Sequence, residues 1–149
     1  MKTNLLTILF FLLLLFSTGC DKPTKDTGFM EKTWKVQSIV NEGRRFTVPS
    51  GNTFSREEAY ILRFIDDPNF VLNTSVNYAG GSYQIVSEGH IVINYGEETK
   101  VYNALEHQRN FDEQLVSAFN GVMSYSYTKN KLIFRGEENT EIVFVKHKR

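Results

Sequence analysis

The stretch Met123–Lys146, MSYSYTKNKLIFRGEENTEIVFVK, carries the clearest structural pattern in the chain. It contains three short runs rich in aromatic and β-branched residues, at Met123–Thr128, Lys131–Arg135 and Thr140–Lys146. Residues of these types favour extended backbone, and the polar segments KN and GEEN between the runs are typical of turns. The sequence therefore predicts that the chain ends in an antiparallel meander of three strands.

Further short strands are predicted before this meander. In the first, Thr33–Val40, Trp34 and Val36 alternate with Lys35 and Gln37, which is the pattern of a half-buried strand. Two hairpins follow, with predicted turns at Asp66–Asn69 and at Glu88-Gly89. The polar stretch Arg44–Arg56, which contains Pro49 and Gly51, is predicted to be a long loop.

One segment has the period of a helix. Phe111, Leu115, Val116 and Phe119 would share a face, and Asn110 with Glu113 forms a capping-box pattern. We expect a helix at about residues 110–120, ended by Gly121 in a left-handed conformation. About eight short antiparallel strands with one inserted helix predict a mainly β (α+β) fold, either a curled antiparallel sheet or a small barrel.

The amino-terminal segment reads as a targeting signal. Lys2 is followed by the apolar run Leu5–Phe16 and the small residues Ser17–Gly19. The run is shorter than the roughly twenty residues of a membrane-spanning helix, and the arrangement is typical of a secretory signal peptide. Ser17-Thr18-Gly19-Cys20 resembles a bacterial lipobox, in which the signal is cut before a cysteine that then carries acyl chains such as palmitate.

The sequence thus predicts a lipoprotein signal peptide at 1–19, a lipidated flexible tether at 20–28 and one domain at 29–149. Cys20 is the predicted lipid attachment site, and it is the only cysteine in the chain. Three other interpretations of Cys20 remain open: a free thiol after an ordinary signal cut, an intermolecular disulfide, or the end of an uncleaved anchor. We expect a lipid-anchored protein of the cell envelope, in the outer membrane of a Gram-negative bacterium, facing the periplasm or the cell surface.

Charge and composition exclude several classes of partner. The chain has 17 basic and 17 acidic residues, so no basic excess suggests nucleic acid binding. Small basic clusters at Arg44-Arg45 and Lys146–Arg149 could touch anionic headgroups near the tether or simply be solvated. The partners we expect are the membrane, through the lipid, and an envelope protein, a glycan or a small ligand.

The sequence contains no recognisable constellation for catalysis, for a metal or for another cofactor. The three histidines, His90, His107 and His147, lack the close spacing of a metal site. Paired carboxylates such as Asp66-Asp67 and Glu97-Glu98 fall in predicted turns or strand ends, where both members share one environment and serve solubility. We therefore predict that the protein is not an enzyme.

A resemblance to a known family rests on Asn77–Tyr83, NYAGGSY, which is similar to the asparagine-to-GSY stretch of the META/HslJ domain. Phe29 and Trp34, the strand Ile61–Phe64 and the helix Phe111–Phe119 follow in the family's order. Two features depart from it, since Val76 stands where the family often has a cysteine and Asn103–Arg109 lacks a characteristic segment. The resemblance implies a small envelope domain whose activity is mostly undefined, with associations to stress or antibiotic tolerance.

Within this stretch Asn77, Tyr78 and Tyr83 are the candidate binding residues, and a structural role is the competing interpretation. Gly80 and Gly81 would allow positive φ or a close backbone approach, and Asn77 could brace the turn. Tyrosines in the predicted sheet suit either a binding surface or ordinary strand packing; they are Tyr78, Tyr83, Tyr95, Tyr102, Tyr125 and Tyr127.

Two functions from different classes follow. The first is a non-catalytic binding or accessory module of the envelope. The second is a lipocalin-like carrier or sensor of a small apolar ligand. A carrier needs a cavity of some hundreds of Å³ within the barrel, whereas a plain binding module should have a filled core.

Overall fold

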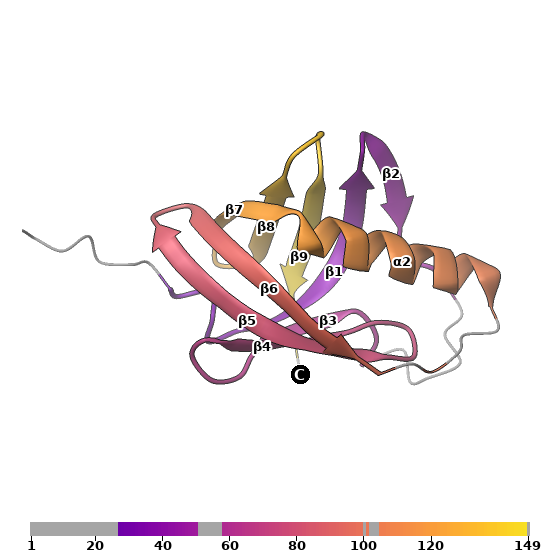
Figure 1. Ribbon diagram of the computed structural model, residues 1–149, viewed down its shortest axis with the longest axis horizontal. Helices are drawn as coiled ribbons and strands as arrows, with labels where there is room; N and C mark the ends of the chain where they lie inside the picture. Colours follow the sequence, from indigo (N-terminus) through magenta and orange to yellow (C-terminus); the bar gives the residue numbers. More distant parts are fainter. Residues whose placement is uncertain (1–26, 51–57, 100, 102–104, 149) are drawn as a thin grey trace, which may run out of the picture.

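The computed structural model describes residues 27–50, 58–99, 101 and 105–148. Cys20 and Tyr102 therefore lie outside the described residues. Within these ranges the structure has nine strands and one helix, labelled as in Figure 1: β1 (Thr33–Asn41), β2 (Arg44–Thr47), β3 (Ile61–Phe64), β4 (Asn69–Asn73), β5 (Tyr78–Ser87), β6 (His90–Glu98), α2 (Glu106–Asn120), β7 (Val122–Tyr127), β8 (Lys131–Gly136) and β9 (Glu141–Lys146). The predicted closing meander is confirmed as β7, β8 and β9.

The strands form a closed antiparallel barrel. Neighbours pair in the order β1-β3-β4-β5-β6-β7-β8-β9, and β9 pairs back onto β1 from Trp34↔Lys146 to Val40↔Glu141. The open alternative, a curled sheet, is thereby excluded. The seam between β6 and β7 is short, because these strands pair only at His90↔Ser124.

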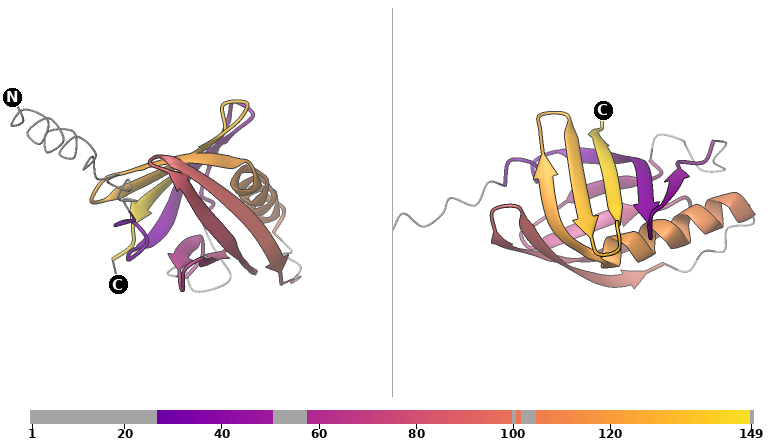
Figure 2. Two further views of the ribbon diagram at one scale, coloured as in Figure 1. Left: turned by 60° about the vertical axis from the view of Figure 1, so that its left-hand side comes forward. Right: turned by 90° about the horizontal axis from the view of Figure 1, so that it is seen from above.

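Helix α2 covers the region where β6 diverges from β7. It packs against β1, β2, β6 and β9 and lies across one side of the barrel (Figures 1 and 2). Asn41 on β1 fixes it, because its amide Nδ2 donates to Gln114 Oε1 at 2.9 Å.

The predicted helix is present, but its predicted start and its left-handed end are wrong. Helix α2 begins at Glu106, with Leu105 as an N-cap that provides no side-chain hydrogen bond. Asn110 is thus an interior helical residue and not the cap. Gly121 does end the helix, although with φ −89°, so its conformation is not left-handed.

The predicted loop at Arg44–Arg56 is partly a strand. Arg44–Thr47 forms β2, which pairs with the second half of β1 through Ser38↔Thr47 to Asn41↔Arg44. The turn uses Glu42 and Gly43, both with positive φ. Three of the four residues of β2 are exposed, so the strand has no need for alternating apolar residues. Its sequence therefore carries no signal that distinguishes it from a loop.

The barrel interior is filled with large side chains. Trp34, Phe70, Phe119, Phe134 and Phe144 are each at most 1% exposed. Phe119 of α2 lies between Phe70 and Phe134, with ring centroids 5.2 and 5.8 Å away. Trp34 satisfies its buried indole by donating from Nε1 to the Phe29 carbonyl at 2.8 Å. Helix α2 therefore contributes core residues to the barrel.

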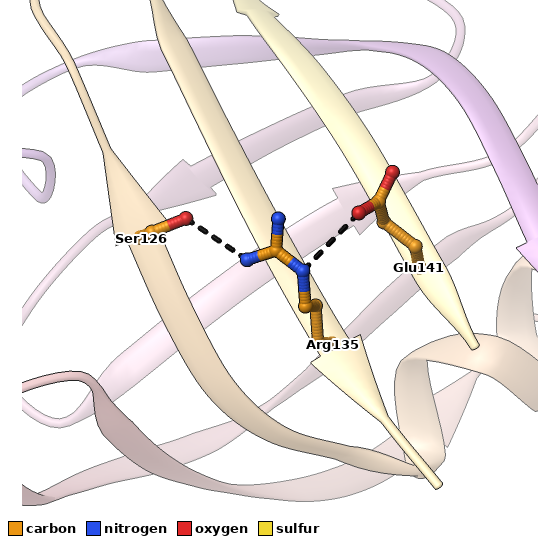
Figure 3. Close-up of polar contacts among 3 residues, drawn as sticks. All are labelled: Ser126, Arg135 and Glu141. Atoms are coloured by element: carbon orange, nitrogen blue, oxygen red, sulfur yellow. Dashed lines mark hydrogen bonds and ion pairs between the residues drawn. The ribbon is translucent and has the colours of Figure 1, made fainter. Parts of the chain in front are cut away.

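Polar contacts join β7, β8 and β9 on their outer face. Arg135 on β8 donates from Nη1 to Ser126 Oγ on β7 at 3.1 Å and pairs through Nε with Glu141 on β9 at 3.2 Å (Figure 3). These contacts are exposed and contribute little to stability. Within the described parts of the chain, no helix has both the length and the apolar character needed to cross a bilayer.

Candidate functional site

A buried polar cluster lies where α2 meets the loop between β4 and β5. The inward face of α2 carries Phe111, Leu115 and Phe119, and the same helical period also turns Gln108 and Asp112 inward. Opposite them, Asn73, Thr74 and Ser75 at the end of β4 are each at most 4% exposed. Polar groups buried in this way require partners.

Asp112 is the centre of this cluster. Its carboxylate accepts hydrogen bonds from the Ser75 backbone N–H at 3.2 Å and from the Ser75 hydroxyl. The Tyr60 hydroxyl lies beside the same carboxylate but forms no hydrogen bond of ordinary geometry. Tyr60 is 1% exposed and has φ +63°, a conformation that is rare for an aromatic residue.

Burial changes the proton affinities of these groups. Burial raises the pKa of Asp112, the Glu113 charge adds to the increase, and hydrogen bonds from Ser75 oppose it. Burial also raises the pKa of Glu98, and the neighbouring Asp112 charge raises it further. The pKa of Tyr60 is raised by burial and by Asp112. Two carboxyl groups of raised pKa thus lie within electrostatic reach of one another.

Asp112 and Glu98 line an open groove of about 560 Å³ between α2 and the end of β6. Most of its other lining residues are polar; they are Asn77, Val101, Arg109, Glu113, Val116, Ser117 and Asn120. Tyr95 lies near both carboxyl groups, and its buried hydroxyl has no hydrogen-bond partner among the described residues. Burial and the charges of Glu98 and Asp112 raise the pKa of Tyr95. The groove thus offers carboxyl groups as hydrogen-bond acceptors, while the Tyr95 hydroxyl lies buried near them.

Asn77, a predicted candidate, lies at the edge of this groove. Its Oδ1 accepts from the Val101 N–H at 2.7 Å and from the Thr99 hydroxyl at 3.1 Å. Its Nδ2 donates to the Val101 carbonyl at 3.1 Å. The side chain thus holds the chain segment that leaves β6 and thereby shapes one wall of the groove.

The other two predicted candidates lie apart from the groove. Tyr78 is 55% exposed at the start of β5. Tyr83 is buried, and its pKa is raised to about 12 by burial and by the neighbouring Asp67 charge. Its ring packs edge-on against Phe64 at 5.1 Å. The structure therefore brings only Asn77 of the three to the groove.

The two glycines of the NYAGGSY stretch differ in their surroundings. A Cβ on Gly81 would lie 2.8 Å from the Phe70 ring and would also collide with the Asn94 carbonyl. A Cβ on Gly80 would meet nothing closer than 3.8 Å. Of the two anticipated roles, close backbone approach is the one that Gly81 has.

The histidines lie on different elements. His90 starts β6, where Nδ1 is 3.1 Å from Ser87 Oγ, His107 is in α2, and His147 follows β9. Among the residues that the structure describes, no group of three or more His, Cys, Asp or Glu side chains is placed to hold a metal ion.

Comparison with known families identifies the domain. The META domain model matches residues 27–149. The chain belongs to the META domain family. This assignment agrees with the resemblance found in NYAGGSY and extends it over the whole described region.

Solved structures share the fold of this META domain. The NMR structure of a protein from Burkholderia xenovorans is 12% identical and has a TM-score of 0.60, with 79% of this chain and 83% of that chain covered. The crystal structure of a DUF4847 family protein from Bacteroides vulgatus is 19% identical and has a TM-score of 0.51, covering 78% and 93%. A search of curated proteins gave no match. At these identities the likeness concerns the fold alone.

Proposed function

We propose that this META domain is a lipid-anchored, non-catalytic binding module of a bacterial cell envelope, and that its ligand occupies the groove between α2 and the end of β6. One observation carries the proposal: Glu98 and Asp112, two carboxyl groups whose pKa values are raised, both line the groove. A ligand rich in hydrogen-bond donors, from an envelope protein or a glycan, would satisfy these groups.

The arrangement around Asp112 supports binding over catalysis. Ser75 donates its hydroxyl to this carboxylate, but Ser75 is only 3% exposed, which leaves no open path from a substrate to its hydroxyl. A catalytic serine needs a base that removes its proton and an open path to a substrate. The Ser75–Asp112 pair therefore serves the structure of the groove.

The filled barrel supports the module over the carrier of a small apolar ligand. The interior is occupied by aromatic rings that contact one another, including Phe119, Phe134 and Phe144, whose successive ring centroids are 5.8 and 5.4 Å apart. The groove at Asp112 opens at the surface, and seven of its nine lining residues are polar or charged. An apolar ligand would have to displace these rings from the core.

The anchor and the envelope location are inferred from the sequence. Cys20 follows the apolar run and the small residues Ser17–Gly19 at the position that a lipobox requires. Metabolic labelling with a fatty-acid analogue tests this part, because replacement of Cys20 should abolish the label. A link to envelope stress or antibiotic tolerance is suggested by the family resemblance, and a deletion strain compared with its complemented parent under envelope stress would test it.

Site-specific crosslinking in native envelopes tests the groove. A photoreactive amino acid replaces Ser117 at the groove or, as the control, Ser126 on the polar outer face of β7. We expect adducts from position 117 that disappear when Glu98→Gln and Asp112→Asn are combined, with no such adducts from position 126. Equal adducts from both positions, or adducts that survive the double substitution, would contradict a ligand in the groove.

A further inference from the structure

The described chain begins at the end of the barrel where three turns gather. The Phe29 ring lies 4.8 Å from Tyr125 and 5.2 Å from Phe64, measured between centroids. The Tyr125 N–H donates to the Gly89 carbonyl in the β5–β6 turn at 2.9 Å. Phe29 thus lies between the β3–β4 and β5–β6 turns, which are on the left in Figure 1. The β7–β8 turn and the last residues of β9 lie at the same end of the barrel, which we call the amino-terminal end.

Exposed apolar side chains stand on two of these turns. Ile65, where β3 ends, is 57% exposed, and Val86 beside the β5–β6 turn is 59% exposed. Val92 and Met123, 43% and 53% exposed, line one shallow groove together with Val86. Exposing large apolar side chains to water is unfavourable, and burying them in an interface lowers the free energy.

Lysines surround the same end. Lys131, Val145 and Lys35 are register partners across β8, β9 and β1, and Lys146 pairs with Trp34 nearby. The Lys146 N–H donates to the Asn130 carbonyl in the β7–β8 turn at 2.9 Å. The Lys32 ammonium lies 5.4 Å from the centroid of the Tyr127 ring. This lysine sector consists of Lys32, Lys35, Lys129, Lys131, Lys146 and Lys148.

Four acidic residues also lie at this end. Glu31, Asp66 and Asp67 line a groove on the β3 side that they share with Lys32, Arg63 and Ile65. Glu88 lies in the β5–β6 turn. The six lysines and Arg63 outnumber these four carboxylates, so the amino-terminal end carries a net positive charge.

We propose that the amino-terminal end is a docking surface for an anionic lipid bilayer. Its orientation rests on the lipid anchor proposed above, although the contact itself is made by the domain. Residues 20–26 would span at most about 25 Å when fully extended, so an anchor at Cys20 holds this end close to the headgroups. Lysines attract anionic headgroups while Ile65 and Val86 enter the interface, which supplies a second membrane signal beside the acyl chains.

Fluorescence quenching by lipids tests the docking. An environment-sensitive fluorescent amino acid replaces Val86 or, as the control, Glu137 in the exposed β8–β9 turn. The full chain is purified from membranes and mixed with vesicles of phosphatidylcholine, with or without phosphatidylglycerol, that carry a brominated quenching lipid. We expect strong quenching at position 86 in the anionic vesicles and much weaker quenching at position 137, with the difference reduced by salt.

Paired charge reversals separate the lysine sector from a general charge effect. Lys129→Glu with Lys131→Glu should remove most of the quenching at position 86. Arg44→Glu with Arg45→Glu, the same charge change on β2, should leave it unchanged. Equal quenching at positions 86 and 137, equal quenching without the anionic lipid, or no association with the vesicles would overturn the proposal.

Two measurements distinguish a failure of the proposed anchor from a failure of the proposed docking surface. The mass of the purified protein reports whether Cys20 is acylated. An unacylated protein that still shows the quenching difference would refute the anchor and support docking. An acylated protein without the difference would support the anchor and refute docking.

Discussion

Ser75 donates both its backbone N–H, at 3.2 Å, and its hydroxyl to the carboxylate of Asp112, a residue 37 positions further along the chain. The pair joins the loop between β4 and β5 to helix α2. It also fixes the position of the carboxyl group that lines the groove. Buried donors left without an acceptor cost more than an ordinary hydrogen bond contributes.

The first prediction compares two substitutions of Asp112. Asp112→Ala removes the acceptor of two hydrogen bonds from Ser75 and should lower the free energy of unfolding by about 1–3 kcal/mol. Asp112→Asn retains an oxygen for the Ser75 N–H and should cost clearly less. Urea denaturation of both variants measures the difference. An alanine variant as stable as the asparagine variant would show that the Ser75 contacts contribute nothing.

The second prediction concerns acidic pH. The pKa values of Asp112 and Glu98 are raised in the folded state, so the folded protein holds protons that the unfolded chain releases. Their contribution to stability should therefore fall as pH rises from the unfolded carboxyl range near 4 through the raised folded values. Asp112→Asn with Glu98→Gln should flatten this fall in thermal unfolding curves, and the single control Glu137→Gln should not.

The parts of the fold that could be predicted from the sequence are those that depend on local residue patterns. The strands of the meander and the buried positions Phe111, Leu115 and Phe119 are local patterns, and these predictions are confirmed. Val116, predicted on the same face, lines the open groove instead. Closure of the barrel depends on the pairing of β9 with β1, which are far apart in the sequence. The alternation of apolar and polar residues within a strand does not determine which strand it pairs with. The early start of α2 was missed because Glu106–Arg109 is polar and carries no apolar period.

The groove itself was missed for a related reason. The sequence predicts that Glu98 serves solubility and does not mark Asp112 as a site residue, because a carboxylate at a strand end or in a helix is usually solvated. Asp112 becomes buried because it shares the helical face of Phe111 and Leu115, which was a usable signal. The partial burial of Glu98 depends on where α2 packs against β6. No pattern in the residues around Glu98 indicates this contact.

The third prediction uses the two glycines of the motif as a matched pair. Gly81→Ala places a methyl group against the Phe70 ring and the Asn94 carbonyl and should lower stability by about 1–3 kcal/mol. Gly80→Ala has room and should be neutral or stabilising by about 0.5 kcal/mol. Chemical denaturation tests both. Equal costs for the two substitutions would mean that close approach is not the reason for glycine at position 81.

The fourth prediction concerns alkaline pH. Tyr60, Tyr83 and Tyr95 have raised pKa values, which for Tyr83 is about 12. In the unfolded chain these phenols ionise near 10, so the unfolded state binds fewer protons there and stability should fall as pH rises above that value. Spectrophotometric titration should show ionisation of these tyrosines coinciding with unfolding. Complete ionisation near pH 10 with the fold intact would contradict their burial.

The fifth prediction distinguishes the hydrogen bonds that Asn77 Oδ1 accepts from the one that its Nδ2 donates. Asn77→Ala removes the acceptor for the Val101 N–H and should speed hydrogen exchange at that amide, while global stability falls by only about 1 kcal/mol because these bonds are exposed. Asn77→Asp keeps the acceptor and should preserve protection of the Val101 amide. It also adds a carboxylate to a groove that already contains Glu98 and Asp112. Mutual repulsion should therefore make the aspartate variant less stable at neutral than at acidic pH, whereas the alanine variant should lack this added dependence.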